Sequence, residues 1–215
     1  MKIIKKNNLQ DIFKEYNNKN KLVIFGKGPS FQIVSKNDNQ IFLCTNDSIN
    51  HIENCDFLVI NDVKNMRKVK KEKLKKLKNL IIPYHIHIKL NPGSPETSQG
   101  PSLDYTYLNF MKEFSEYYSG NLIVYNLKTI DKNYPEFINL DSAISSAHSG
   151  LEFILNNFKI KKVTTYGIGI KNGYHELFIP TVTKEHIELC CSQLRTDIFR
   201  DELKKMTKDI TLKIN

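Results

Sequence analysis

Short apolar runs alternate along this chain with longer segments whose apolar positions recur at helical spacing. The short runs predict strands at Lys21–Phe25, Gln40–Thr45, Asp56–Ile60, Leu80–Ile82, Asn121–Tyr125 and Lys162–Tyr166. The longer segments predict helices over residues 64–78, 105–118, 143–158 and 183–206. Continuously apolar strands are typical of a sheet covered on both faces, and their alternation with helices is typical of parallel strands. The pattern therefore predicts an α/β fold with a mostly parallel sheet.

One stretch interrupts this alternation. Residues 91–104, NPGSPETSQGPSLD, combine prolines, glycines and hydroxyl side chains, which predicts a long loop. A loop of this length is either a lid over a ligand or a simple surface connection. No linker divides the chain, and 215 residues fit one domain. Residues 1–215 are therefore predicted to form a single domain.

The charge is strongly positive and uneven. The formal net charge is +9, and residues 64–78, KNMRKVKKEKLKKLK, carry a large share of it. Such a segment either contacts a membrane surface or an acidic acceptor, or is the solvated face of a helix. Nothing in it points specifically to nucleic acid. No apolar run reaches the ~18 residues that span a bilayer, and the N-terminus lacks a signal-peptide pattern, so a cytoplasmic location is expected.

Candidate binding residues follow the predicted strands. In an open parallel sheet, ligands bind beyond the carboxyl ends of the strands. The residues at these positions that are candidates for nucleotide contact are Gly26, Lys27, Gly28, Pro29, Ser30, Asn46, Asp47 and Gly167. The turn Gly26–Ser30 either changes the chain direction or brings bare backbone to a phosphate. A cation and a proline at the first helical turn favour the phosphate.

Hydroxyl groups gather where the helix over 143–158 begins. Ser145, Ser146, His148, Ser149 and Gly150 form a polar helix entrance that either holds phosphate and ribose oxygens or faces solvent. Farther along, His175 follows a glycine-rich turn after a strand. Its imidazole is a candidate general base, with a loop histidine of no catalytic role as the alternative. Tyr174 is a candidate donor to a departing phosphate. No metal site is expected, because no ligand set of suitable spacing is visible.

Four stretches occur in an order that resembles bacterial sialyltransferases and related Rossmann-type glycosyltransferases, including a family linked to flagellin modification. They are LVIFGKGPSF, IFLCTNDSINHI, CDFLVIND and SSAHSGLEFILNNFKIKKVTTYGIGIKNGYHELF. The resemblance implies a single-domain Rossmann-like three-layer fold. It also implies transfer of a sugar from a nucleotide-activated donor to a glycan or other hydroxyl acceptor, without a metal or other cofactor. The donor that the resemblance implies is a CMP-sugar.

The resemblance assigns roles residue by residue. Nucleotide contacts fall on Gly26, Gly28, Pro29, Ser30 and Asn46, and ribose or phosphate contacts on Ser145, Ser146, Ser149 and Gly150. Tyr174 would stabilise the leaving phosphate, and His175 would be the general base. The chain departs from the family at Lys27, where an asparagine is usual, and at Gly169, where many relatives have an aspartate.

Two alternatives stay open at this point. One is a pterin-type diphosphokinase that uses ATP and Mg²⁺, for which Asp47, Asp56 and Asp62 are the available carboxylates. The other is a non-catalytic nucleotide-binding protein of the same fold, which the glycine at position 169 would suit.

Overall fold

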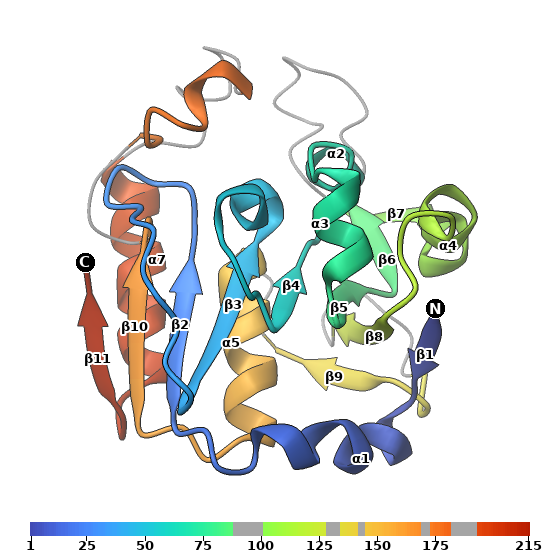
Figure 1. The fold of residues 1–215 in the computed structure, drawn as a ribbon, viewed down its shortest axis with the longest axis horizontal. Coiled ribbons are helices and arrows are strands. Elements are labelled where there is room, and N and C mark those ends of the chain that lie inside the picture. The colour runs from blue at the N-terminus through green and yellow to red at the C-terminus, as the bar shows by residue number, and fades with distance from the viewer. Residues whose placement is uncertain (88–100, 128–133, 142–144, 169–172, 182–192) are drawn as a thin grey trace.

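A nine-stranded sheet forms the centre of the chain (Figure 1). A computed structural model describes residues 1–87, 101–127, 134–141, 145–168, 173–181 and 193–215. The strand order is β1-β8-β5-β4-β3-β2-β10-β11, with β9 paired to β8, and each of these pairings is parallel. The α/β Rossmann-like fold predicted from the sequence is confirmed.

The strands of this sheet are β1 (Lys2–Ile4), β2 (Lys21–Phe25), β3 (Gln40–Thr45), β4 (Phe57–Val59), β5 (Asn79–Pro83), β8 (Asn121–Leu127), β9 (Ile138–Leu140), β10 (Lys162–Tyr166) and β11 (Thr211–Ile214). A separate antiparallel pair consists of β6 (His85–His87) and β7 (Pro101–Thr106). The α-helices are α1 (Leu9–Phe13), α2 (Val63–Met66), α3 (Lys71–Lys76), α4 (Tyr107–Phe114), α5 (Ser146–Asn157) and α7 (Gln193–Met206). Short 3₁₀ helices are η1 (Lys6–Asn8), η2 (Lys14–Tyr16), η3 (Asn46–His51) and η5 (Ile179–Thr181).

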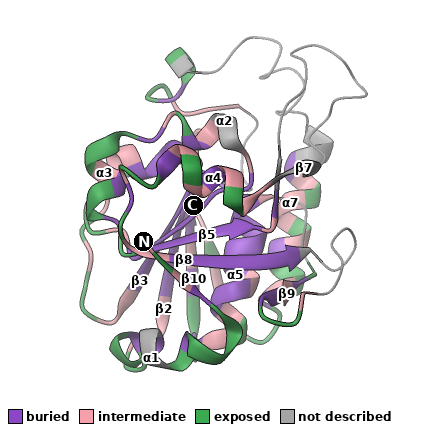
Figure 2. Cartoon of the chain, turned by 90° about the vertical axis from the view of Figure 1, so that its right-hand side faces the viewer, coloured by how far each residue is buried: buried purple, intermediate pink, exposed green. Residues whose placement is uncertain are grey.

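Two hydrophobic cores sandwich the sheet, as the buried central strands in Figure 2 show. Along β2, Leu22 and Ile24 belong to the core beneath α1, α5 and α7. Val23 and Phe25 belong to the core on the opposite face, with residues of η3, α2, α3 and α4. Side chains of a strand alternate between its faces, so a strand buried on both faces must be apolar throughout. This is why the apolar runs were sufficient to locate the central strands.

The edges of the sheet were not predicted. The strands β2, β3 and β10 have the predicted bounds, whereas β1, β9 and β11 were missed. The strand β1 is only three residues long, and no residue of β11 is buried. Edge strands carry polar residues and make fewer contacts, so they lack the apolar signature of the central strands.

The predicted helix over 64–78 is interrupted in the structure. Asn50 of η3 donates from Nδ2 to the Lys68 carbonyl (2.9 Å) and accepts the Lys70 N–H at Oδ1 (2.8 Å). These side-chain hydrogen bonds replace helical ones, and Lys70 is extended at φ −65°, ψ 135°. The result is the two short helices α2 and α3. The predicted apolar positions are nevertheless buried: Met66, Val69, Leu74 and Leu77.

The predicted loop and the next helix also change. Residues 88–100 lie outside the described residues, but the end of the predicted loop, from Pro101, belongs to β7. The helix begins at Tyr107 rather than at residue 105, because Thr106 caps it. The Thr106 hydroxyl accepts the Leu108 N–H, and Asn109 Oδ1 accepts the Thr106 N–H. The helix predicted over 183–206 is described only from Gln193, where α7 begins.

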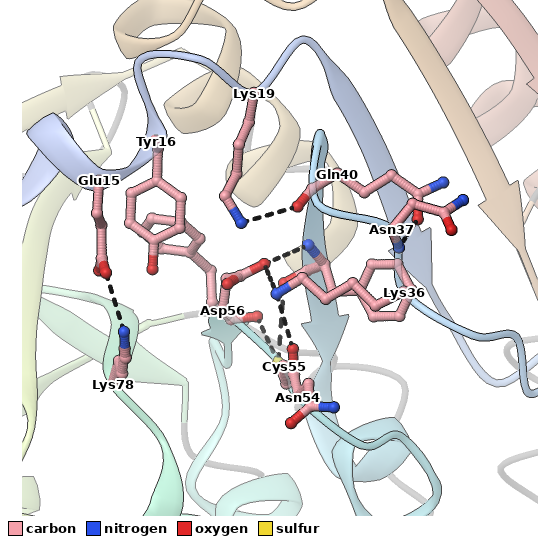
Figure 3. Close-up of polar contacts among 12 residues, drawn as sticks. Glu15, Tyr16, Lys19, Lys36, Asn37, Gln40, Asn54, Cys55, Asp56 and Lys78 are labelled. Carbon is pink, nitrogen blue, oxygen red and sulfur yellow. Dashed lines mark hydrogen bonds and ion pairs between the residues drawn. The ribbon is translucent and has the colours of Figure 1, made fainter.

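A polar network closes the amino ends of the central strands (Figure 3). Asp56 precedes β4, accepts the Phe42 N–H at 2.7 Å and pairs with Lys36 at 2.6 Å. The Tyr16 hydroxyl accepts a hydrogen bond from Asn79 Nδ2 (3.1 Å), which also donates to the Asp56 carbonyl. The network anchors the irregular segment between β2 and β3 at the end of the sheet opposite the carboxyl ends.

Within the described part of the chain, no helix combines the length and apolar character needed to cross a membrane.

Candidate functional site

The strand order reverses direction at β2. From β2 the chain passes through β3, β4 and β5 on one side, and it later places β10 on the other side of β2. The connections that leave β2 and β10 therefore diverge to opposite faces, and a crevice opens between them. Such a switch point is where doubly wound α/β proteins bind their ligands.

A pocket of about 160 Å³ lies at this switch point. Its walls come from the ends of β2, β3 and β10, from the start of α5 and from α7. The lining residues are Gly26, Lys27, Gly28, Thr45, Asn46, Ser145, Ser146, Ala147, Gly167, Ile168, Gly173, Tyr174, Thr196 and Phe199. Pockets that enclose drug-sized ligands are usually ~300–1,000 Å³, so this volume suits a phosphate with part of a sugar rather than a whole nucleotide-sugar.

The glycines of the pocket allow two turns to interlock. The Gly26 N–H donates to the Tyr166 carbonyl and the Gly28 N–H to the Gly167 carbonyl, both at 2.8 Å. The Gly167 N–H donates to Ser30 Oγ at 3.1 Å. A Cβ on Gly28 would lie 2.8 Å from the Gly167 carbonyl oxygen, and Gly167 has a φ of +73°. These glycines are thus explained by close approach of the turns, and the N–H groups of Gly26 and Gly28 are already used within the protein.

Among the lining residues that the structure describes, Lys27 is the cation. Its Nζ lies 2.9 Å from Asp47 Oδ1, with side-chain exposures of 9% for Lys27 and 3% for Asp47. The contact is ionic rather than a directional hydrogen bond, because Asp47 Oδ1 has no partner in hydrogen-bond geometry. The ammonium also lies 5.5 Å from the centre of the Tyr174 ring. Asp47 and Tyr174 therefore hold Lys27 at the pocket, and the Asp47 carboxylate partly neutralises its charge.

Asn46 has an uncommon backbone conformation at the pocket wall. Its φ is +54°, in the left-handed region that asparagine tolerates better than most residues. Its Oδ1 accepts a hydrogen bond from the Ser146 hydroxyl at 3.3 Å. This bond directs the Asn46 amide and links the end of β3 to the start of α5.

The helix α5 begins at the pocket. The polar side chains of its first turn are more deeply buried than the sequence indicated. His148 and Ser149 are fully buried, which excludes the interpretation of this side as a solvent face. Ser149 Oγ donates to the Ser145 carbonyl at 3.3 Å. A Cβ on Gly150 would lie 2.9 Å from both Leu43 and Val59, so this glycine lets α5 approach the sheet closely.

His148 connects α5 with α7. Its Nδ1 lies 2.8 Å from Ser145 Oγ, and its Nε2 lies 3.0 Å from the Phe199 carbonyl oxygen. Burial lowers the pKa of His148, although the Phe199 carbonyl acts in the opposite direction. The imidazole is therefore neutral near pH 7.

The structure brings together many of the residues singled out from the sequence. Those that line the pocket are Gly26, Lys27, Gly28, Asn46, Ser145, Ser146, Gly167 and Tyr174. Others do not line the pocket but contact a lining residue. Ser30 and His148 are hydrogen-bonded to Gly167 and Ser145, and Asp47 is ion-paired with Lys27. Pro29, Ser149 and Gly150 are also outside the lining. Gly169 lies outside the described residues.

His175 is not among the lining residues. Its N–H donates to the Lys27 carbonyl at 2.9 Å, and its Nδ1 accepts the Leu177 N–H at 3.3 Å. The ring packs edge-on against Phe31 with centroids 5.6 Å apart. These contacts attach the segment after Gly173 to the turn after β2, and the role of His175 as a general base stays a prediction.

Several lining residues were not predicted. Thr45, Ile168 and Gly173 adjoin predicted residues, so a wider window around each strand end would have included them. Thr196 and Phe199 of α7 had no signal, because their contribution depends on how α7 packs against α5.

The carboxylates considered for Mg²⁺ do not meet. Asp47 follows β3 at the carboxyl ends of the strands, whereas Asp56 precedes β4 at the opposite end. Asp62 accepts hydrogen bonds from the backbone and side chain of Asn65 at the start of α2. In the described ranges, no group of three or more His, Cys, Asp and Glu side chains is placed to hold a metal ion.

The basic segment 64–78 is not part of the pocket lining. Several of its charges are paired: Arg67 with Glu113, Lys73 with Glu53 and Lys78 with Glu15. Exposed lysines remain on α3, including Lys71, Lys75 and Lys76. Contact of this segment with a membrane surface or an acidic acceptor stays a prediction.

No family model, curated protein or solved structure matches this chain. The resemblance to sialyltransferases thus rests on four stretches of the sequence alone.

Proposed function

We propose that the pocket binds the phosphate and ribose of a nucleotide-activated sugar, and that the protein is a sialyltransferase-like glycosyltransferase using a CMP-sugar. One observation carries the proposal: the Lys27 ammonium, the Asn46 amide and the amino end of α5 share a pocket at the switch point of a parallel sheet. The first N–H groups of a helix lack partners within the helix and favour an anion.

The groups in the pocket suit a monophosphate leaving group. As the bond from sugar to phosphate breaks, negative charge grows on the phosphate oxygens. The N–H groups of the first turn of α5, the ammonium of Lys27 and the phenol of Tyr174 are donors that would stabilise this charge. In this scheme the glycines of the interlocked turns shape the pocket and donate nothing to the phosphate, since the N–H groups of Gly26 and Gly28 have internal acceptors.

Fewer residues account for activation of the acceptor than for stabilisation of the leaving phosphate. Deprotonation of an acceptor hydroxyl needs a base within hydrogen-bond reach. His175 follows Tyr174 directly but is not in the lining. Its placement favours a second candidate, a nucleotide-binding protein of this fold without transferase activity. Release of CMP from a CMP-sugar distinguishes the two.

Thermal denaturation with a panel of nucleotides tests the binding site. CMP at about 100 times its Kd should stabilise the fold by ~2.7 kcal/mol, which corresponds to a Tm increase of roughly 5–10 °C in a chain of this size. The panel contains CMP, UMP, AMP and ATP, each with and without Mg²⁺. Stabilisation only by ATP with Mg²⁺ would favour the diphosphokinase, and no response to any nucleotide would contradict the proposal.

A matched pair of variants locates the ligand. Ser146→Asp places a carboxylate at the start of α5, where it suits the helix dipole but repels a phosphate. Ser146→Asn introduces a side chain of nearly the same shape as aspartate but without its charge. We expect the Asp variant to remain folded and to bind CMP at least 10-fold more weakly than the Asn variant. Equal binding by both variants would place the nucleotide elsewhere.

Release of CMP from a CMP-sugar then separates the two candidates. A transferase releases CMP in the presence of a hydroxyl acceptor, and a non-catalytic protein binds the nucleotide without turnover. A His175→Ala variant that binds CMP but releases none would assign the base to His175, whereas undiminished turnover would remove that assignment.

A further inference from the structure

The hydrogen-bond partners of His148 determine whether Ser145 donates or accepts in the hydrogen bond that joins these two residues at the pocket wall. The Phe199 carbonyl can only accept, so the His148 nitrogen that lies 3.0 Å from it, Nε2, must carry a proton. The reverse tautomer would bring two lone pairs together. The tautomer is therefore set by the packing of α7 on α5.

The other ring nitrogen then has one possible role. His148 is completely buried and neutral, so Nδ1 carries no proton and can only accept. Its partner is Ser145 Oγ at 2.8 Å. Ser145 must therefore donate its hydroxyl proton to His148, and only its lone pairs are available to anything else. Ser145 is the N-cap residue of α5, but its hydroxyl accepts no N–H of the first turn, so these lone pairs are not used for capping.

From this chain of hydrogen bonds we infer that Ser145 is an obligate hydrogen-bond acceptor in the pocket, and that it selects a ligand with a hydroxyl donor at that place. The inference rests on the proposed function and deepens it. If the ligand is a nucleotide, the donor is a ribose hydroxyl, and His148 is a positioning residue that makes the pocket prefer ribonucleotides over deoxyribonucleotides.

This assignment divides the pocket into two parts. Lys27 and the N–H groups at the start of α5 supply donors for a phosphate. Ser145 supplies an acceptor, which a phosphate oxygen cannot use, since a phosphate dianion has no proton to give. The hydroxyl of Ser145 is thus assigned to the sugar rather than to the phosphate.

The test compares CMP with its 2′-deoxy and 3′-deoxy analogues by calorimetry. One hydrogen bond to a neutral group typically changes affinity by about 3–10-fold, so the wild type should bind CMP that much more tightly than at least one analogue. Ser145→Ala should bind CMP and that analogue about equally. Asn156→Ala, at an exposed position of α5, is the control and should keep the wild-type preference.

A conservative variant separates polarity from packing. In His148→Gln the amide NH₂ takes the place of Nε2–H and keeps the hydrogen bond to the Phe199 carbonyl, but nothing replaces Nδ1 as the acceptor. The Ser145 hydroxyl is then free to rotate, so the preference for the ribonucleotide should fall while the Tm stays close to that of the wild type. A long-range ¹⁵N–¹H spectrum of the wild type should show the proton of His148 on Nε2.

The outcomes are distinct. Equal affinity of the wild type for CMP and both analogues would overturn this inference and leave the proposed nucleotide site standing. A proton found on Nδ1 would also overturn it, by removing the acceptor for Ser145. Failure of every nucleotide to bind would overturn the proposed function and this inference with it.

Discussion

The substitution Gly26→Ala tests how closely the two turns of the pocket must approach. The φ of Gly26 is not in the positive region, so alanine fits the backbone and the cost is steric. The new Cβ would clash with the backbone carbonyl oxygen of Gly167 and lie 2.5 Å from Ile168 Cγ1. The Ile168 side chain can move, but the carbonyl belongs to the turn after β10, so the turns must separate.

The expected magnitude combines two effects. Overpacking of a tight site typically costs ~1–3 kcal/mol. Separation of the turns also weakens the hydrogen bond from the Gly28 N–H to the Gly167 carbonyl, at ~0.5–1.5 kcal/mol. We expect Gly26→Ala to lower the free energy of unfolding by about 2–4 kcal/mol, which corresponds to a Tm decrease of roughly 4–16 °C in a chain of this size.

Urea denaturation of the ligand-free protein is the assay, because it measures the fold without any contribution from a nucleotide. Asn156→Ala is the control and should change stability by no more than about 0.5 kcal/mol. If Gly26→Ala kept full stability and lost only CMP binding, the glycine would serve ligand approach alone, and the explanation by interlocked turns would be refuted.

Three further predictions concern side chains around the pocket. Ser30→Ala removes the acceptor of the Gly167 N–H, so urea denaturation should show a loss of about 1 kcal/mol, and an unchanged midpoint would show that the bond contributes nothing. Lys27→Ala leaves Asp47 buried without its cation and should cost about 3–5 kcal/mol, whereas adding Asp47→Asn should restore much of the loss in a double-mutant cycle; purely additive effects would contradict the ion pair. His148 has a folded-state pKa below its unfolded value of ~6.5, so the unfolded state binds more protons, and stability should rise with pH from the folded-state pKa up to about pH 6.5. Denaturation across this range should show a smaller slope in His148→Gln, and an equal slope in both proteins would disprove burial of the neutral ring.

Local sequence was sufficient for the central sheet and for much of the pocket. Strands buried on both faces, such as β2 and β3, are apolar apart from their end residues, so their positions follow from composition. The pocket candidates followed from one topological rule, because Lys27 and Asn46 come directly after those strands.

Other features depend on pairings that the sequence does not display. The acceptors of the Gly26 and Gly28 N–H groups lie on the turn after β10, far along the chain. The break between α2 and α3 depends on the Asn50 side chain of η3, and the burial of His148 depends on α7. Asp56 was grouped with Asp47 because both adjoin predicted strands, but they adjoin opposite ends.

The hydrogen bond from Gly167 to Ser30 joins positions 137 residues apart in the chain. Closure of so long a segment is entropically costly and belongs to the late, slow steps of folding. During synthesis, the first half of the sheet can therefore assemble without a cavity, and the cavity appears only when β10 docks beside β2. If the pocket binds a nucleotide as proposed, its affinity would report completed folding, and truncation before β10 would abolish binding however well the remaining strands are paired.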